Sequence, residues 1–232
     1  MPAYRSSHEA DIRDDVVKHI RERWPSARII HEINVAGQGS NRIDVLAVAP
    51  EAMLAVEIKS KKDKLDRLPD QLKAMRRAVH FSFAAIHEKF LVPHETNEWS
   101  AWWTDEDGKH WNKRLPDDLD LLSSQCWVWP RERRAAKGSS YDFLSKWDFP
   151  AMPMQAPLPQ GALDMLWADE LRTLCHELRF GVGPRTTMSQ CLSVLRWNAT
   201  GKELTRGVCR ALRRRNCIEA DDPVFDKVGD LL

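Results

Sequence analysis

The sequence predicts an α/β fold, in which helices flank a mixed β-sheet and a helical region follows towards the C-terminus. Apolar residues recur at helical spacing near the N-terminus, and three apolar, β-branched segments follow them. Beyond residue 160, three segments return to a helical period. With 232 residues, of which 43% are apolar, the chain can bury one full core plus a smaller appendage.

The first predicted helix covers residues 9–24. Ile12, Val16 and Ile20 recur along it at helical spacing, which places them on one face. Pro25 should end this helix, because proline cannot donate the hydrogen bond that a helix interior requires.

Three strands are predicted next, at residues 28–35, 42–49 and 53–59. The last two are joined by a short breaker around a proline, so they should form a hairpin. A two-residue turn would pair Ala49 with Ala52, and this register fixes which side chains lie opposite each other.

A longer helix is expected from residue 65 to about residue 86, with Pro69 tolerated only in its first turn. Residues 90–92 are predicted as a short strand that closes the sheet. Residues 99–111 are predicted as a Trp-rich hairpin about an Asp-Gly turn, and residues 125–130 as one more strand.

We predict three parts: a sheet domain at 1–148, a Pro-rich linker at 149–160 and a helical region at 161–232. Four prolines fall within or next to the linker, which suits a semi-rigid spacer better than a helix or strand. The helical region should contain three helices, at 161–180, 186–198 and 201–216.

The composition is that of an ordinary soluble protein, and we expect it to be cytoplasmic. No window approaches the roughly 18 uninterrupted apolar residues that cross a bilayer, so no membrane partner is expected. The five cysteines include no CxxC pair and no histidine at zinc-finger spacing, which favours reduced thiols.

Positive charge is local rather than global, since the formal net charge is only +1. Between Lys59 and Arg77 there are eight basic residues against three acidic ones. Between Lys202 and Arg215 there are six against one. Such clusters attract polyanions, although charge runs are more often solvated helix faces.

Asp44, Glu57 and Lys59 stand at the ends of two apolar strands. In the predicted hairpin Asp44 falls opposite Glu57, and Lys59 shares the face of Glu57 because it is two residues away. Two buried carboxylates side by side are costly unless a cation lies between them. The pattern predicts a Mg²⁺ site, for which Mn²⁺ could substitute, and metal-assisted hydrolysis of a phosphodiester.

This pattern resembles the PD-(D/E)xK nuclease superfamily, with Ile43-Asp44 and Glu57-Ile58-Lys59 as its motif residues. The proline of the motif name is replaced by Ile43. The resemblance implies a restriction-endonuclease-like sheet. It also implies an additional acid on the first helix, matched by Glu9, and a glutamine on the helix after the motif, matched by Gln71. Asp44, Glu57 and Glu9 would hold the metal. Lys59 would act on the attacking water or stabilise charge on the phosphate, and Gln71 would position that lysine or the scissile strand, which gives five candidate catalytic residues.

The chain further resembles a little-characterised bacterial and phage group of such nucleases, related to resolvases and VRR-NUC proteins. The matching segments are Glu9 to Arg13, Arg42 to Asp44, Glu57 to Ser60, Asp63 to Gln71 and Leu166 to Glu170.

Two acidic residues have alternative interpretations. Glu9 could instead complete a capping box with Ser6. Glu32 could be an auxiliary metal ligand, or it could form an ion pair with Arg42 across the first strands. The ten tryptophans could stack on unpaired bases, although such rings more often fill a core.

Five basic residues are candidate phosphate contacts, with simple solvation as the alternative. They lie in the two basic clusters: Lys61, Lys62, Arg67, Arg213 and Arg214.

The expected function is therefore a Mg²⁺-dependent DNA nuclease, most readily an endonuclease. The expected partner is DNA, and a homodimer is possible. The alternative is a catalytically silent or partner-dependent nucleic-acid-binding component of a repair or phage-defence system. Metal binding that is lost in Asp44→Asn while folding survives would distinguish the two.

Overall fold

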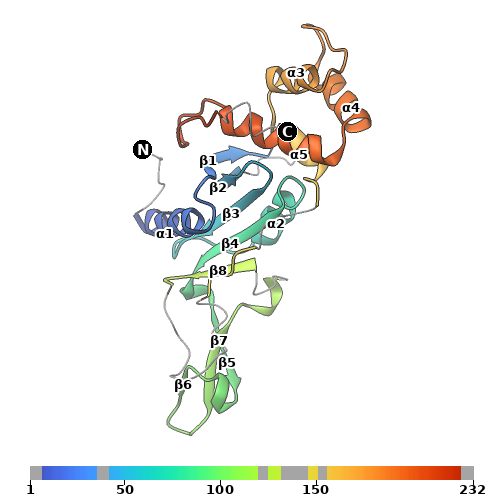
Figure 1. Ribbon diagram of the computed structural model, residues 1–232. Helices are drawn as coiled ribbons and strands as arrows, with labels where there is room; N and C mark the ends of the chain where they lie inside the picture. The colour runs from blue at the N-terminus through green and yellow to red at the C-terminus, as the bar shows by residue number, and fades with distance from the viewer. Residues whose placement is uncertain (1–6, 36–41, 120–124, 132–145, 151–155, 226–232) are drawn as a thin grey trace.

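The protein has the α/β architecture that the sequence predicts (Figure 1). The computed structural model describes residues 7–35, 42–119, 125–131, 146–150 and 156–225. A five-stranded mixed sheet has the order β1-β2-β3-β4-β8, and a separate three-stranded antiparallel sheet has the order β5-β7-β6. Helices cover both faces of the larger sheet, which therefore separates two hydrophobic clusters.

Helix α1, Ser7–Arg23, confirms the first predicted helix. Ile12, Val16 and Ile20 are fully buried and pack in one cluster with alternate residues of the sheet. Ser6, the partner of Glu9 in the alternative capping box, lies outside the described residues.

Strands β1 (Arg28–Asn34), β2 (Arg42–Val48) and β3 (Met53–Lys59) are antiparallel neighbours. The predicted hairpin register is confirmed, because the Ala49 amide donates to the Ala52 carbonyl, N–O 2.9 Å.

The long helix predicted to about residue 86 is wrong in its second half. Helix α2 covers only Leu68–Met75, with Pro69 in its first turn as expected. Phe81–His87 forms strand β4, parallel to β3. Within β4, Phe83 lies in the hydrophobic cluster on one face of the sheet and Ile86 in the cluster on the other face. A strand buried on both faces has no polar alternation to reveal it.

The expectation that residues 90–92 close the main sheet is also wrong. Strand β8, Cys126–Trp129, forms that edge instead. Val92 begins β5, Val92–Thr96, in the smaller sheet, which projects from the main body in Figure 1. The Trp-rich hairpin is confirmed: β6, Trp103–Thr104, pairs with β7, His110–Arg114, and Gly108 takes the positive φ of 78° that its turn requires.

The C-terminal region is helical, as predicted. A 3₁₀ segment, Gln160–Met165, precedes α3 (Ala168–Glu177), α4 (Met188–Asn198) and α5 (Gly201–Arg214). Apolar residues of these helices share a hydrophobic cluster with α2 and one face of the sheet. The division into three parts remains a prediction.

Short 3₁₀ turns, Glu88–Phe90, Glu98–Ser100 and Asp117–Leu119, complete the described elements. All five cysteines are free thiols. Within the described ranges, every helix is too short or too polar to cross a membrane.

Candidate active site

The candidate site lies at the open end of the β2–β3 hairpin, away from its turn. The strands part here, since the last ladder pair is Val45 with Val56, one step before Asp44 and Glu57. The Ile58 amide instead donates to the Asp44 carboxylate, N–Oδ2 2.7 Å. Asp44 thus reaches β3 through its side chain rather than through its backbone.

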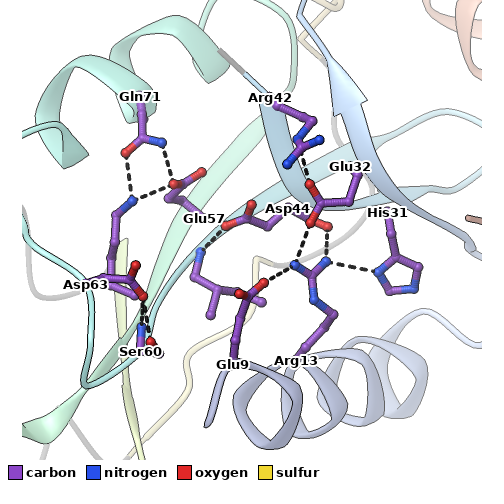
Figure 2. Close-up of polar contacts among 12 residues, drawn as sticks. Glu9, Arg13, His31, Glu32, Arg42, Asp44, Glu57, Ser60, Asp63 and Gln71 are labelled. Atoms are coloured by element: carbon purple, nitrogen blue, oxygen red, sulfur yellow. Dashed lines mark hydrogen bonds and ion pairs between the residues drawn. The ribbon is translucent and has the colours of Figure 1, made fainter. Parts of the chain in front are cut away.

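Glu57, Lys59 and Gln71 form a closed triangle of hydrogen bonds (Figure 2). Lys59 Nζ lies 2.6 Å from Glu57 Oε1 and 2.9 Å from Gln71 Oε1. Gln71 Nε2 donates to the same Glu57 oxygen at 2.5 Å. The first two residues share a face of β3, and Gln71 reaches them from α2. The ammonium is therefore held from two elements.

A cavity of about 530 Å³ opens at this end of the hairpin. Arg42, Lys64 and Arg67 add positive charge to its wall. It is also lined by all five residues that the sequence predicts to be catalytic: Glu9, Asp44, Glu57, Lys59 and Gln71. The structure therefore brings together residues that are up to 62 positions apart in the sequence, counted from Glu9 to Gln71.

Both central carboxyl groups are poorly solvated. Burial, and then the nearby Asp44 charge, raise the pKa of Glu57 to about 7. Burial also raises the pKa of Asp44, although the Ile58 hydrogen bond opposes that rise. Glu57 is 2% exposed, and its Oε2 atom has no hydrogen-bond partner in the structure. A buried acceptor of this kind is destabilising unless another group meets it.

A buried arginine, Arg13, organises the other side of the cavity. Its guanidinium donates to Glu9 Oε1 at 2.5 Å, to Glu32 Oε1 at 2.8 Å and to the Asp44 carbonyl oxygen at 2.5 Å. The sequence alone predicts no role for this residue. Two signals pointed to it: its position four residues after Glu9 on the same helix, which is the spacing of an ion pair, and its place in the Glu9 to Arg13 segment of the family resemblance.

Glu9 and Glu32 are both engaged in ion pairs. Glu9 lines the cavity as its inward position predicts, with its carboxylate bound to Arg13. Glu32 forms the predicted ion pair with Arg42, Oε2–Nε 2.6 Å, in addition to its contact with Arg13.

The segment after β3 presents positive charge beside the cavity. Asp63 Oδ2 accepts from the Ser60 amide and hydroxyl, both at 2.7 Å, and so shapes a tight turn. Lys61, Lys62 and Arg67 are exposed around this turn, and Arg67 also lines the cavity. These three predicted phosphate contacts are accessible.

The other two predicted phosphate contacts lie on α5, and the structure contradicts the prediction for Arg213, whereas that for Arg214 stays a prediction. Arg213 is 2% exposed and donates to the backbone carbonyls of Ser26 and Val48, so its guanidinium is not available to a phosphate. Arg214 is about one-third exposed, and its Nη1 atom lies 3.9 Å from Glu177 Oε1. Both belong to α5, which packs beside the turn end of the hairpin, whereas the cavity is at the open end.

A metal ion in this cavity would depend on Asp44 and Glu57 as its protein ligands. Among the residues that the structure describes, no three His, Cys, Asp or Glu side chains are grouped closely enough to hold a metal ion. A three-carboxylate site that includes Glu9 is therefore not assembled in this conformation. Two carboxylates remain sufficient for Mg²⁺, which commonly keeps several waters and uses one or two protein carboxylates.

Comparison with known proteins gives one family match. The family described as bacteriophage P4 protein cII matches residues 3–93, which is less than half of the 232-residue chain. No curated protein and no solved structure matches the chain. The matched segment runs from α1 through β4, so the chain is similar to bacteriophage P4 protein cII over all five residues of the candidate active site.

Proposed function

We propose that this protein is a Mg²⁺-dependent nuclease that hydrolyses phosphodiester bonds in DNA. One observation carries the proposal: Asp44, Glu57 and Lys59 meet in a single cavity with Gln71, and one buried carboxylate oxygen there has no hydrogen-bond partner among the described residues. Carboxylates around a hollow, with an ammonium beside them, suit a reaction in which a cation and a phosphate bind together.

The residues present fit a divalent cation. The cavity is lined by five acidic side chains (Glu9, Asp44, Glu57, Asp63 and Asp66) and four basic ones (Arg42, Lys59, Lys64 and Arg67). Burial raises the pKa values of both central carboxyl groups, and the Asp44 charge further raises that of Glu57. A cation bound between the two groups would favour their charged forms. Their hard oxygen atoms suit Mg²⁺.

A bound Mg²⁺ would polarise the phosphodiester and activate the water that attacks it. Lys59 would donate to a phosphate oxygen and stabilise the negative charge that grows in the transition state. Gln71 has a supporting role, since it would keep its hydrogen bond to Lys59 Nζ if the Glu57 carboxylate turned to a cation. The lysine would then stay in place when its ion pair is broken.

Exposed basic residues beside the cavity support a nucleic-acid substrate. Lys61, Lys62, Lys64 and Arg67 are exposed within one short segment that also contains Asp63 and Asp66. Lys64, Arg67 and both aspartates line the cavity. Exposed lysine and arginine side chains bind phosphate groups without reading sequence. We propose that this segment binds the DNA backbone next to the bond that is cut.

We also propose membership of the PD-(D/E)xK nuclease superfamily. The support is the order of elements, helix, strand, hairpin, helix and parallel strand, together with the position of Asp44 and Glu57-Ile58-Lys59 on the hairpin.

The direct test is cleavage with Mg²⁺ of single-stranded, duplex, flapped and four-way DNA. Lys59→Ala should lower the rate at least about 100-fold, as expected when a group that stabilises transition-state charge is removed. Lys73→Ala is the matched control, because Lys73 is an exposed lysine of α2 that does not line the cavity. Cleavage by the Lys59→Ala protein at the wild-type rate would refute the proposed role of the lysine.

A second candidate is a nucleic-acid-binding component without catalysis of its own, in repair or phage defence. It is favoured by one observation, that Lys61, Lys62 and Arg67 are exposed and could bind a phosphate backbone whether or not the cavity is catalytic. Calorimetric titration with Mn²⁺ separates the two candidates. The nuclease should bind the ion, and Asp44→Asn should abolish binding while the melting curve stays cooperative. A wild-type protein that binds DNA but no divalent ion would favour the second candidate.

A further inference from the structure

Arg13 is one of the most deeply buried charged residues of the protein, with 1% of its surface exposed. It joins three elements at the cavity wall: Glu9 on α1, Glu32 on β1 and the Asp44 carbonyl on β2 (Figure 2). Burying a guanidinium is unfavourable unless it is paired and hydrogen-bonded, and here two carboxylates and a carbonyl satisfy that need.

The backbone around this guanidinium departs from regular strand geometry. Glu32 has a positive φ of 58°, a strained conformation for a residue other than glycine. The β1–β2 pairing passes from His31–Val45 to Ile33–Ile43 and skips Glu32 and Asp44 between them. The distortion therefore lies beside the residue that carries the first carboxylate of the cavity.

The distortion also changes which way β1 side chains point. Ile30, Ile33 and Val35 all belong to one hydrophobic cluster, although strict alternation would put Glu32 with Ile30. The positive φ shifts the alternation by one residue, which places the Glu32 carboxylate within ion-pair distance of Arg13 and Arg42.

We infer that Arg13 is a positioning residue for the proposed metal-dependent cleavage, because it fixes the Asp44 backbone and holds Glu9 at the cavity wall. It contacts the Asp44 carbonyl rather than the carboxylate, so it acts through the chain. The Asp44 side chain then reaches the Ile58 amide, which sets the carboxylate beside Glu57. The role of Arg13 in metal-dependent cleavage rests on the proposed function, whereas its contacts with Asp44 and Glu9 do not.

His31 fits the same role. Burial, and then the Arg13 charge, lower the pKa of His31 to about 4, so the imidazole is neutral near pH 7. A neutral ring can accept from the guanidinium, and His31 Nδ1 lies 3.3 Å from Arg13 Nη1.

The test compares Arg13→Gln with Arg28→Gln by amide hydrogen exchange. Arg28 is the matched control because it is equally buried, at 1% exposed. It is the first residue of β1, away from Glu32, and it donates to carbonyls at the end of α5. Arg13→Gln should speed exchange of the Ile58 amide at least tenfold relative to the Val56 amide. Arg28→Gln should leave that ratio unchanged, although both variants should melt at lower temperature. Equal ratios in the two variants would overturn the inference.

Arg13→Lys adds a second comparison. It keeps the charge, but one ammonium cannot bond the carbonyl and both carboxylates in the fork geometry of a guanidinium, so an intermediate exchange ratio is expected. Full wild-type protection in Arg13→Lys would mean that charge alone suffices and would overturn the positioning role.

A metal titration separates this inference from the proposed function. Mn²⁺ should bind Arg13→Gln at least tenfold more weakly than wild type, and Arg28→Gln normally. If wild type binds no Mn²⁺, the metal-dependent function fails, yet the exchange result still decides whether Arg13 positions Asp44. If wild type and Arg13→Gln bind Mn²⁺ equally, the inference fails while the function stands.

Discussion

The β2–β3 hairpin meets basic segments of the chain at both of its ends, and the two ends use that charge in opposite ways. At the open end, Lys61, Lys62 and Arg67 are exposed beside the cavity that Asp44 and Glu57 line. At the turn end, Arg206 and Arg213 of α5 are fixed by ion pairing or burial. The availability of a charge, rather than its density in the sequence, decides whether it can bind a polyanion.

Most of the arginines at the turn end are held by acids from other parts of the fold. Four arginines of α5 and of the residue after it pair with three acids: Arg206 with Glu51, Arg210 and Arg214 with Glu177, and Arg215 with Glu170. Arg28 and Arg213 donate to backbone carbonyls across the same junction. This end joins the C-terminal helices to the sheet.

The largest effect, on the free energy of unfolding, is expected for a substitution at the turn end. Arg213→Gln should lower the free energy of unfolding by about 2–5 kcal/mol, because the carbonyls of Ser26 and Val48 would lose a buried donor. Its neighbour provides the control, since Arg214 is about one-third exposed and Arg214→Gln should cost no more than about 1 kcal/mol. Urea unfolding measures both. A stable Arg213→Gln protein with weakened DNA binding would restore the phosphate-contact interpretation.

The next largest effect, on DNA affinity, is expected for substitutions at the open end. The double variant Lys62→Ala/Arg67→Ala should weaken duplex DNA binding about tenfold in low salt and reduce the salt slope by about 1 for each phosphate that the protein no longer neutralises. Stability should change by less than about 0.5 kcal/mol per site, since both side chains are exposed.

The matched double variant removes the same charge from the turn end. Arg206→Ala/Arg210→Ala should leave both the DNA affinity and the salt slope unchanged, because these side chains are already paired with Glu51 and Glu177. Fluorescence anisotropy across a salt series measures all three proteins. Equal losses in the two double variants would show that both ends bind DNA.

A pH series sharpens the comparison, because the raised carboxyl pKa values described here are at the open end. The pKa of Glu57 is about 7 in the folded protein, above its usual value of 4.5, so a divalent ion must displace a proton below pH 7. Mn²⁺ affinity should therefore rise by up to about tenfold per pH unit below pH 7 and level off above it. Titration calorimetry at several pH values tests this, and a flat profile from pH 5.5 to 8 would contradict it.

The same shift affects stability without metal. Because folding raises the pKa of Glu57, its protonated form stabilises the folded state below about pH 4.5, and that contribution is lost as the pH rises through about 7. Glu57→Gln, which stays neutral, should show a flatter dependence of unfolding free energy on pH. Identical pH profiles for the two proteins would argue against the raised pKa.

The sequence could predict the open end because its determinants are local. A short turn fixes the register of the hairpin, and the register alone puts Asp44 opposite Glu57. Gln71 follows from the next helix and the resemblance to a known family. The fold class follows from the periodicity of the apolar residues.

The remaining features depend on partners that are distant in the sequence. Strand β4 escaped detection because it is apolar on both faces and follows a helical run without a clear break. The role of Arg13 depends on the backbone conformation of Glu32 and on a contact with Asp44, 31 residues away. The ion pairs of the α5 arginines could not be predicted from the sequence, because Glu51 and Glu177 lie far from them along the chain.

The smallest expected effect concerns Arg206 alone. Its Nε atom lies 2.5 Å from Glu51 Oε1, but the two side chains are 34% and 49% exposed, so water and salt screen the pair. Arg206→Ala should therefore cost no more than about 1 kcal/mol of unfolding free energy. The loss should shrink further at higher salt, whereas the loss in Arg213→Gln should persist, because a buried hydrogen bond is not screened. Urea unfolding at two salt concentrations makes the comparison, and a loss for Arg206→Ala as large as that for Arg213→Gln would mean that both arginines hold α5 on the sheet.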